Sequence, residues 1–296
     1  MRSNQRFKGE VRPAPERVSP SKYDAHYFLH ACEGSGLYAE YGGTKLGDRH
    51  AAVFDIAKVR VGETVVDVGC GRGELTIACA KAGARVYAID YAPAALEIAW
   101  RTIKLALPAY DADSSVVVIQ GDATRVPLPD SSADLVLMAD IVEHLIPAEL
   151  SSALAEAYRV LRPGGRLVVH TMPNRWYYSF GYPVYRLALG MLGSSLPRDP
   201  RDRWEYVKEV HVNEQSPRSL AARLREIGFR CRVWVTSVTP AYRERPWVRY
   251  LRRCLPHMYP INLILCNDIM AVARKPACAQ PPGLFTNERG TPSAAR

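Results

Sequence analysis

Short apolar runs and amphipathic stretches alternate along the middle of the chain, from residue 63 to residue 172. The runs are rich in Val, Ile and Leu and are typical of buried strands, whereas the stretches between them carry apolar residues at helical spacing. The predicted strands are residues 63–69, 85–90, 115–122, 133–140 and 166–172, and the predicted helices are residues 74–83, 92–107 and 147–161. This alternation predicts an α/β domain with a parallel sheet and helices on both faces.

The pattern continues less regularly toward the C-terminus. A predicted helix at 218–229 is followed by strands at 230–238 and 261–275. Two segments interrupt it, one at 175–210 and an arginine-rich one at 240–260. Both are longer than ordinary connections. We therefore expect one domain at 61–275 that carries two insertions.

The ends of the chain differ from this core in composition. Residues 21–60 are rich in aromatic side chains and are predicted to form a helical cap, broken near Gly34 and at Gly42 and Gly43. Residues 1–20 are polar and residues 276–296 are rich in Pro, Ala and Gly. Both stretches are predicted to be flexible tails.

Composition points to a cytoplasmic protein. Hydrophobic residues make up 48% of the 296 residues, enough for a substantial core. We find no apolar run near the roughly 20 residues that a membrane-spanning helix needs, and the polar N-terminus does not resemble a secretory signal. The seven cysteines are scattered and indicate reduced thiols.

The net charge of +9 is concentrated in one part of the chain. Residues 175–260 contain 16 Lys and Arg against 7 Asp and Glu, which accounts for the whole excess. A basic region favours an anionic partner such as nucleic acid, a phosphorylated metabolite or acidic lipid, although it is also compatible with an ordinary solvated surface.

Part of this charge lies in a possible amphipathic helix within the second insertion. Arg249, Arg252 and Arg253 alternate with apolar residues at helical spacing, namely Trp247, Tyr250, Leu251, Cys254, Leu255 and Met258. A basic amphipathic helix can lie on an anionic membrane, or it can pack its apolar stripe on the domain. Peripheral association with the inner membrane surface therefore remains open.

The segment "VVDVGCGRGELT" places Gly69, Gly71 and Gly73 directly after the first strand. A glycine turn at the carboxyl end of such a strand lets the backbone approach a ligand closely. Dinucleotide-binding proteins continue with a third glycine where this chain has Glu74, and a carboxylate there would repel a pyrophosphate. Together with Asp67, Glu74 favours a cationic or amine-bearing ligand over NAD.

Four motifs together resemble the class I S-adenosylmethionine-dependent methyltransferases over about residues 63–169. They are "DVGCGRG", "YAID", "GDATRVPLPDSSADLVLMADIVEHL" and "VLRPGGRLVV", and they occur in the order of that family. The resemblance implies a Rossmann-like doubly wound sheet of seven strands, mostly parallel with one antiparallel strand. It also implies S-adenosyl-L-methionine as the cofactor.

The resemblance assigns cofactor contacts residue by residue. Asp90 would accept both ribose hydroxyls, Asp122 the adenine amino group and Ala123 the ring edge, and Asp140 would close the cofactor wall at the end of strand four. Asp67, Gly69, Cys70, Gly71 and Gly73 would surround the amino acid moiety, with Cys70 chosen for its small size. Tyr91 would lie on the adenine or pack in the core, and Asp67, Asp90 and Asp122 have ordinary capping or turn roles as alternatives.

His144, His170 and His211 are the candidates for acid–base chemistry on the methyl acceptor. The "EHL" at 143–145 and the His before "NEQSP" resemble ubiquinone-pathway O-methyltransferases, which implies His144 or His211 as general base with Glu143 beside them. We expect no metal, while a Mg²⁺ site formed by Asp140, Glu143, His144 and His211 is an alternative. A purely structural role for Glu143 and His144 is another.

The sequence thus predicts methyl transfer to a small-molecule acceptor, most naturally an oxygen of a metabolite, sugar or lipid-linked intermediate. The family resemblance makes residues 175–210 a lid over the acceptor pocket. A nucleic acid acceptor is disfavoured because strand four ends in "ADIVEHL" and lacks the Asn-Pro-Pro-Tyr motif. A membrane-surface lipid methyltransferase and a non-catalytic cofactor-binding protein are the remaining alternatives.

Overall fold

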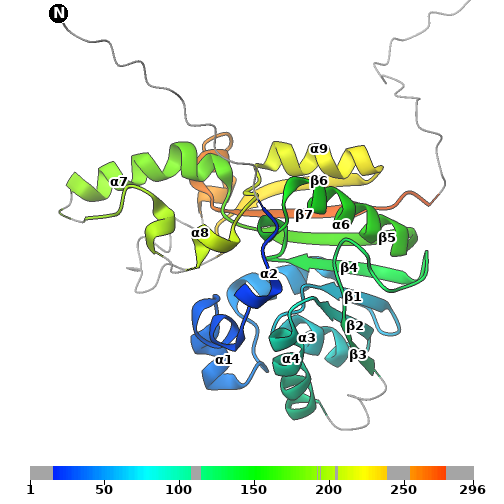
Figure 1. Cartoon of the computed structure of the whole chain (residues 1–296). Coiled ribbons are helices and arrows are strands. Elements are labelled where there is room, and N and C mark those ends of the chain that lie inside the picture. The colour runs from blue at the N-terminus through cyan, green and yellow to red at the C-terminus, as the bar shows by residue number, and fades with distance from the viewer. Residues whose placement is uncertain are drawn as a thin grey trace, which may run out of the picture.

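The computed structural model describes residues 16–107, 115–191, 193, 195–203, 206–238 and 254–277. A seven-stranded sheet forms its centre, with the strand order β3-β2-β1-β4-β5-β7-β6 (Figure 1). The strands are β1 (Thr64–Val68), β2 (Arg85–Asp90), β3 (Val116–Gln120), β4 (Ala133–Ala139), β5 (Leu161–Thr171), β6 (Arg230–Thr236) and β7 (Asp268–Arg274).

The sheet is parallel except for β7. β1 pairs in parallel with β2 and β4, β2 with β3, and β4 with β5. β7 runs antiparallel to both β5 and β6. The predicted doubly wound sheet with one antiparallel strand is therefore confirmed. All parallel strands direct their carboxyl ends to one edge, where a ligand site is expected in such sheets.

Helices cover both faces of the sheet. Consecutive strand residues point to opposite faces, and since both sets are apolar, both faces must be covered. Val65 and Val66 are both fully buried, one against each layer. One layer is made by α6 (Pro147–Val160) and α9 (Pro217–Ile227). The other is made by α2 (Asp48–Ala57), α3 (Glu74–Lys81) and α4 (Pro93–Ala106).

The N-terminal segment forms short helical turns above the carboxyl edge of the sheet. These are η1 (Pro20–Lys22), η2 (Tyr27–Ala31) and α1 (Ser35–Tyr41). Val18, Tyr23 and Phe28 are buried there in a small apolar cluster with Ala95 and Ile98 of α4. Residues 16–20 were expected in a flexible tail from their composition, but the structure places them against the protein because Val18 enters this cluster.

The described residues of the segment inserted between β5 and α9 form four short helical elements. They are η4 (Tyr177–Gly181), α7 (Tyr182–Met191), η5 (Pro200–Arg203) and α8 (Val207–Val210). α7 reaches out from the body of the protein, whereas α8 lies close to the N-terminal turns (Figure 1). Before β7 the chain forms η6 (Leu255–His257) and α11 (Asn262–Leu265). Most of the predicted basic helix at 247–258 lies outside the described residues.

The loop after β4 carries three of the predicted site residues. The strand is followed by η3 (Val142–His144), a single 3₁₀ turn. Asp140 stands before it in the left-handed region with φ of 56°. Asp140 bonds His170, whereas Glu143 and His144 bring potential ligand atoms within 4.8 Å of each other. No helix of the described residues combines the length and apolar character needed to cross a membrane.

Candidate active site

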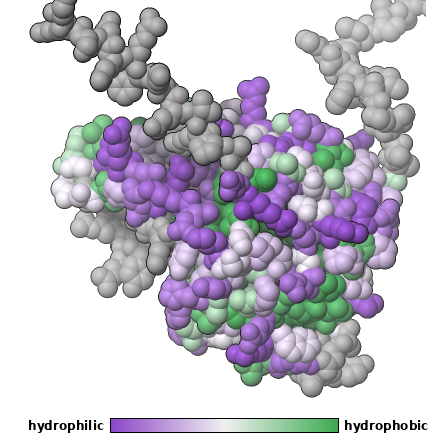
Figure 2. Space-filling view, in the orientation of Figure 1, coloured by the Kyte–Doolittle hydropathy of each residue, from purple (hydrophilic) through white to green (hydrophobic). Residues whose placement is uncertain are grey.

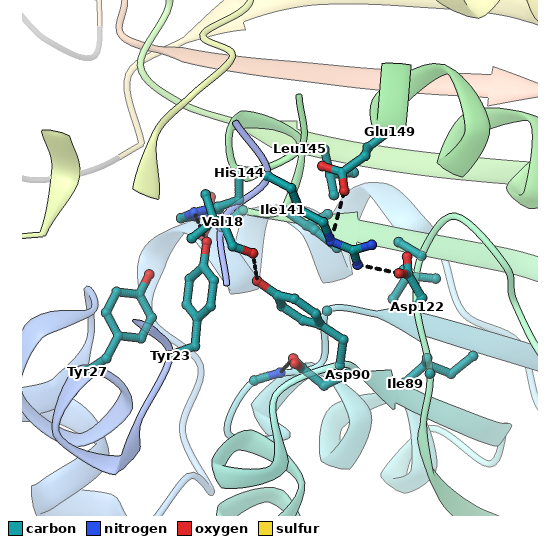
Figure 3. A pocket seen from close by; sticks show the side chains of 18 of the residues that line it. Val18, Tyr23, Tyr27, Ile89, Asp90, Asp122, Ile141, His144, Leu145 and Glu149 are labelled. Carbon is teal, nitrogen blue, oxygen red and sulfur yellow. Dashed lines mark hydrogen bonds and ion pairs between the residues drawn. The ribbon is translucent and has the colours of Figure 1, made fainter. Parts of the chain in front are cut away.

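A pocket opens at the carboxyl edge of the sheet, where ligands bind in folds of this kind. Its walls come from the glycine turn, the ends of β2 and β4, and the N-terminal segment (Figure 3). Eight of the predicted site residues line it, namely Gly69, Gly71, Asp90, Tyr91, Asp122, Ala123, Asp140 and His144.

The other predicted site residues lie behind this wall. Asp67 is buried inside β1, where its carboxylate accepts a hydrogen bond of 2.6 Å from the Thr76 hydroxyl, and burial raises its pKa to about 6. Cys70 and Gly73 belong to the glycine turn without lining the pocket, and Glu143 and His211 sit next to His144. They can shape the pocket only through their neighbours.

The backbone conformation of the glycine turn explains why it contains three glycines. Gly69, Gly71 and Gly73 have φ angles of 74°, 52° and 86°, in the left-handed region that other residues adopt at a cost. A Cβ on Gly69 would also come within 2.9 Å of Ile141 Cδ1. The turn therefore keeps backbone, and no side chain, next to the pocket.

Asp90 ends β2 with its carboxylate at the centre of the pocket wall. It is 7% exposed. Its Oδ2 accepts from the Gly71 amide at 3.0 Å and its Oδ1 from the Ala92 amide at 2.9 Å. Burial raises the pKa of Asp90, and these amides oppose that rise. Each oxygen retains a further lone pair for a hydroxyl donor.

Asp122 lies at the far end of the pocket, after β3, and is paired with an arginine from the N-terminal segment. Its Oδ1 accepts from the amide and hydroxyl of Thr124 at 2.8 and 2.7 Å. Its Oδ2 accepts from Arg17, which also bonds Glu149 at 3.0 Å (Figure 3). Burial alone would raise the pKa of Asp122, but Thr124 and Arg17 bring it below its usual value.

Asp140 is fixed by a buried network of charges at the end of β4. The fully buried His170 bonds Asp140 through Nδ1 at 2.5 Å and Asp268 through Nε2 at 3.2 Å. Arg49 of α2 reaches the same Asp140 oxygen at 3.1 Å. Burial would lower the pKa of His170, but the two carboxylates raise it to about 10. His170 is thus a charged support for Asp140, not a base.

Replacement of His170 by asparagine should destabilise the protein by about 3–5 kcal/mol near neutral pH, because two buried carboxylates lose their common cation. The pKa of His170 is higher in the folded state than the roughly 6.5 of an unfolded chain. Its contribution is therefore complete below pH about 6.5 and is lost as pH rises toward about 10. Urea unfolding of both proteins across this range should show a shrinking difference, and a constant difference would contradict the charged state.

Glu143 is buried beneath the loop after β4. Its Oε2 accepts from the Thr171 hydroxyl at 2.7 Å. Its carbonyl oxygen accepts from the amides of Val212 and Asn213 at 2.9 and 3.1 Å, which ties the loop to the segment before α9. Burial and the neighbouring Asp140 raise the pKa of Glu143 to about 7.

His144 and Tyr23 form a hydrogen-bonded pair inside the pocket. The distance from Tyr23 Oη to His144 Nδ1 is 2.9 Å. With its proton on Nε2, the neutral ring of His144 accepts the Tyr23 hydroxyl proton at Nδ1. Burial lowers the pKa of His144 to about 4, and burial raises that of Tyr23 far above its usual value, so both are neutral at physiological pH.

His211 packs edge-on against His144, with ring centroids 4.9 Å apart. Its Nδ1 is buried and has no hydrogen-bond partner among the described residues. Potential ligand atoms of Glu143, His144 and His211 all lie within 4.8 Å of one another. Asp140, the fourth member of the magnesium alternative, instead bonds His170 and Arg49. The expectation that no metal is used stays a prediction.

Arg17, Tyr23, Arg49 and the aromatic pair Tyr27 and Phe28 are site residues that motif analysis did not find. Tyr23, Tyr27 and Phe28 belong to the aromatic-rich segment after residue 20, and its composition was the available signal. Arg17 lies in a stretch that composition marks as a tail, and nothing in its neighbourhood marks it as a site residue.

The pocket fits the cofactor that the motifs implied. A buried carboxylate with free lone pairs stands at the end of β2, and a second carboxylate stands at the end of β3. The glycine turn leaves room where any Cβ would intrude. Asp90 and Asp122 suit ribose hydroxyls and an amino group, and the acidic wall suits a ligand with a positive charge.

Comparisons with known proteins identify the family of the chain. The model of the methyltransferase domain family matches residues 66–169, from within β1 through most of β5. The demethylmenaquinone methyltransferase of Tropheryma whipplei is 33% identical over 193 residues, which cover 64% of this chain and 76% of that protein. The malonyl-[acyl-carrier protein] O-methyltransferase of Serratia marcescens is 36% identical, over 53% of this chain and 49% of the relative.

Solved structures of lower sequence identity share the fold. The crystal structure of a protein from Bacillus halodurans, described as a methyltransferase, superposes with a TM-score of 0.52 at 21% identity, over 78% of this chain and all of that one. That likeness concerns the fold alone. The identity to the Tropheryma relative goes further, because the matched residues cover three quarters of that protein's length. The chain belongs to the class I S-adenosylmethionine-dependent methyltransferases, and S-adenosylmethionine is its cofactor.

Proposed function

We propose that this methyltransferase transfers its methyl group to a hydroxyl oxygen of a small-molecule acceptor. The observation that carries the proposal is the Tyr23–His144 hydrogen bond, because both residues line the pocket that also contains Asp90 and Asp122. A proton acceptor beside the cofactor is useful for a hydroxyl, which must lose its proton as it is methylated.

S-adenosylmethionine, when bound, supplies an electrophilic methyl group on a sulfonium. The chain positions the acceptor and removes its proton. Tyr23 Oη can take the acceptor's proton as its own proton passes to His144 Nδ1. This relay uses the neutral tautomer of His144 with its proton on Nε2, which leaves Nδ1 to accept. Glu143 and His211 would hold the loop and ring in place rather than touch the acceptor.

Aromatic side chains support an apolar or aromatic acceptor. Tyr27 and Phe28 line the pocket next to Tyr23. Tyr206, immediately before α8, stands edge-on to Tyr27 with centroids 5.8 Å apart. This contact with the pocket wall supports a lid role for residues 175–210. Of the two relatives, the Tropheryma protein is named for a demethylated quinone, which is such an acceptor, whereas the Serratia protein is named for a carrier-bound malonyl group, which is not.

The test is release of S-adenosylhomocysteine from purified protein with a defined set of acceptors. The set contains 1,4-dihydroxynaphthalene, catechol, malonyl-N-acetylcysteamine, a reducing sugar and transcribed RNA. Turnover of a hydroxyl-bearing small molecule, with the methyl located on oxygen by mass spectrometry and NMR, is the expected result. Turnover of RNA alone, or methylation only at carbon or nitrogen, would refute the proposal.

Arg17→Ala should tighten S-adenosylmethionine binding by about three- to tenfold. Arg17 occupies the Asp122 oxygen that the adenine amino group would use and must leave it for the cofactor to bind as proposed. Two partly exposed ion pairs stabilise that arrangement, each by up to about 1 kcal/mol. Isothermal titration measures the change, with Lys22→Ala as control because Lys22 makes an exposed ion pair nearby with Glu209. Unchanged or weaker binding by Arg17→Ala would show that Arg17 does not compete.

A further inference from the structure

The inserted segment exposes an apolar surface that the proposed chemistry does not use. Val184, Leu187 and Met191 of α7 are 60%, 68% and 77% exposed. Their spacing of three and four residues places them on one face of the helix. Among the described elements α7 packs closely only against η4, the turn that precedes it. Large side chains on one face of a protruding helix mark an interaction site.

A second group of exposed apolar residues adjoins the base of α7. Met258, Tyr259 and Ile261, just before α11, are all exposed. α11 packs directly against η4, so closely that a Cβ on Gly181 would overlap the Ile264 carbonyl oxygen. Phe180 of η4 is exposed as well. We define α7 with Phe180 and the turn at 258–261 as the α7 surface. Figure 2 shows apolar residues at the protruding end of α7.

The positive charge of the α7 surface indicates a partner with negative charge. Residues 175–198 contain three arginines and no acidic residue, and residues 254–266 contain no acidic residue either. Arg175, Arg186 and Arg198 are exposed. Exposed apolar side chains in a segment that carries arginines and no carboxylate are typical of attachment to anionic lipid.

We propose that the α7 surface docks the protein on an anionic lipid bilayer. α7 lies in the same inserted segment as Tyr206, which contacts Tyr27 of the pocket wall, so this orientation rests on the lid role proposed above. Docking would therefore place the entrance for the acceptor at the membrane while the cofactor end, at β2 and β3, faces the solvent. In Figure 1 α7 extends from the side of the molecule on which α8 lies, and the β3 edge of the sheet is remote from it.

Vesicle flotation tests this surface without any acceptor. The full chain is mixed with vesicles of phosphatidylcholine alone, or with 30% phosphatidylglycerol, at low and high salt. The test variant is Val184→Ser with Leu187→Ser. The matched control is Val61→Ser with Leu105→Ser, because these residues are exposed to a similar degree, 85% and 86%, on a different part of the protein.

We expect binding to vesicles that contain phosphatidylglycerol, weakened by high salt and at least about tenfold weaker for the test variant. The control variant should bind like the unmodified chain. Absence of binding, or equal binding by both variants, would overturn the proposal. A dimer in light scattering that only the test variant disrupts, without vesicle binding, would assign the surface to a second copy instead. These outcomes do not depend on methyl transfer, so they are separate from a failure of the proposed function.

Discussion

Replacement of Asp90 by alanine is expected to weaken S-adenosylmethionine binding by about a hundredfold or more. The carboxylate is 7% exposed in the pocket wall and stands where the ribose hydroxyls are expected. Hydrogen bonds to a charged group contribute about 1.5–3 kcal/mol each, and the loss of two corresponds to at least a hundredfold in affinity. Isothermal titration with S-adenosylmethionine and S-adenosylhomocysteine measures the effect, with NAD as the non-cognate ligand.

The control must separate ligand contacts from support of the glycine turn. Asp90 also accepts the Gly71 amide, so its removal could loosen the turn itself. Asp90→Asn keeps one carbonyl acceptor and should bind with an intermediate affinity, while Asp55→Ala, an exposed carboxylate on α2, should bind like the unmodified chain. Binding by Asp90→Ala within threefold of the unmodified chain, with unfolding unchanged, would remove Asp90 from the cofactor site.

The sheet and the cofactor wall could be predicted from sequence because their signals are local. Each strand is an apolar run, and each helix has its own periodicity and a Gly or Pro signal at one end. The cofactor residues follow directly after strands, so strand order alone brings Gly69, Asp90 and Asp122 to one edge of the sheet. A parallel sheet collects the carboxyl ends of its strands whatever the loops contain.

The acceptor side could not be predicted because its contacts join distant segments. Tyr23 meets His144 across 121 positions, and Arg17 meets Asp122 across 105. No periodicity or motif links such pairs. His170 illustrates a further difficulty. The sequence offers it as a candidate base, but only the positions of Asp140 and Asp268 show that it is held as a cation.

The second large effect is expected at His144. Replacement by alanine should lower kcat by about 100- to 1,000-fold, the usual contribution of a positioned proton acceptor, with S-adenosylmethionine affinity unchanged within twofold. Tyr23→Phe removes the hydroxyl that bonds Nδ1 and should lower kcat in the same direction. The rate is measured with the first acceptor that turns over. His30→Ala, an exposed histidine of η2, is the matched control and should retain full activity.

The pH profile distinguishes a proton acceptor from a structural histidine. Only the neutral imidazole can accept, and burial lowers the pKa of His144 to about 4. The rate of the unmodified enzyme should therefore hold from pH 8 to about 5 and fall as pH approaches 4, and added imidazole should partly restore the His144→Ala variant. An acid limb near pH 7 would instead follow Glu143, whose pKa is raised to about 7. That result, or full activity of His144→Ala, would move proton removal from the Tyr23–His144 pair to Glu143 or to solvent.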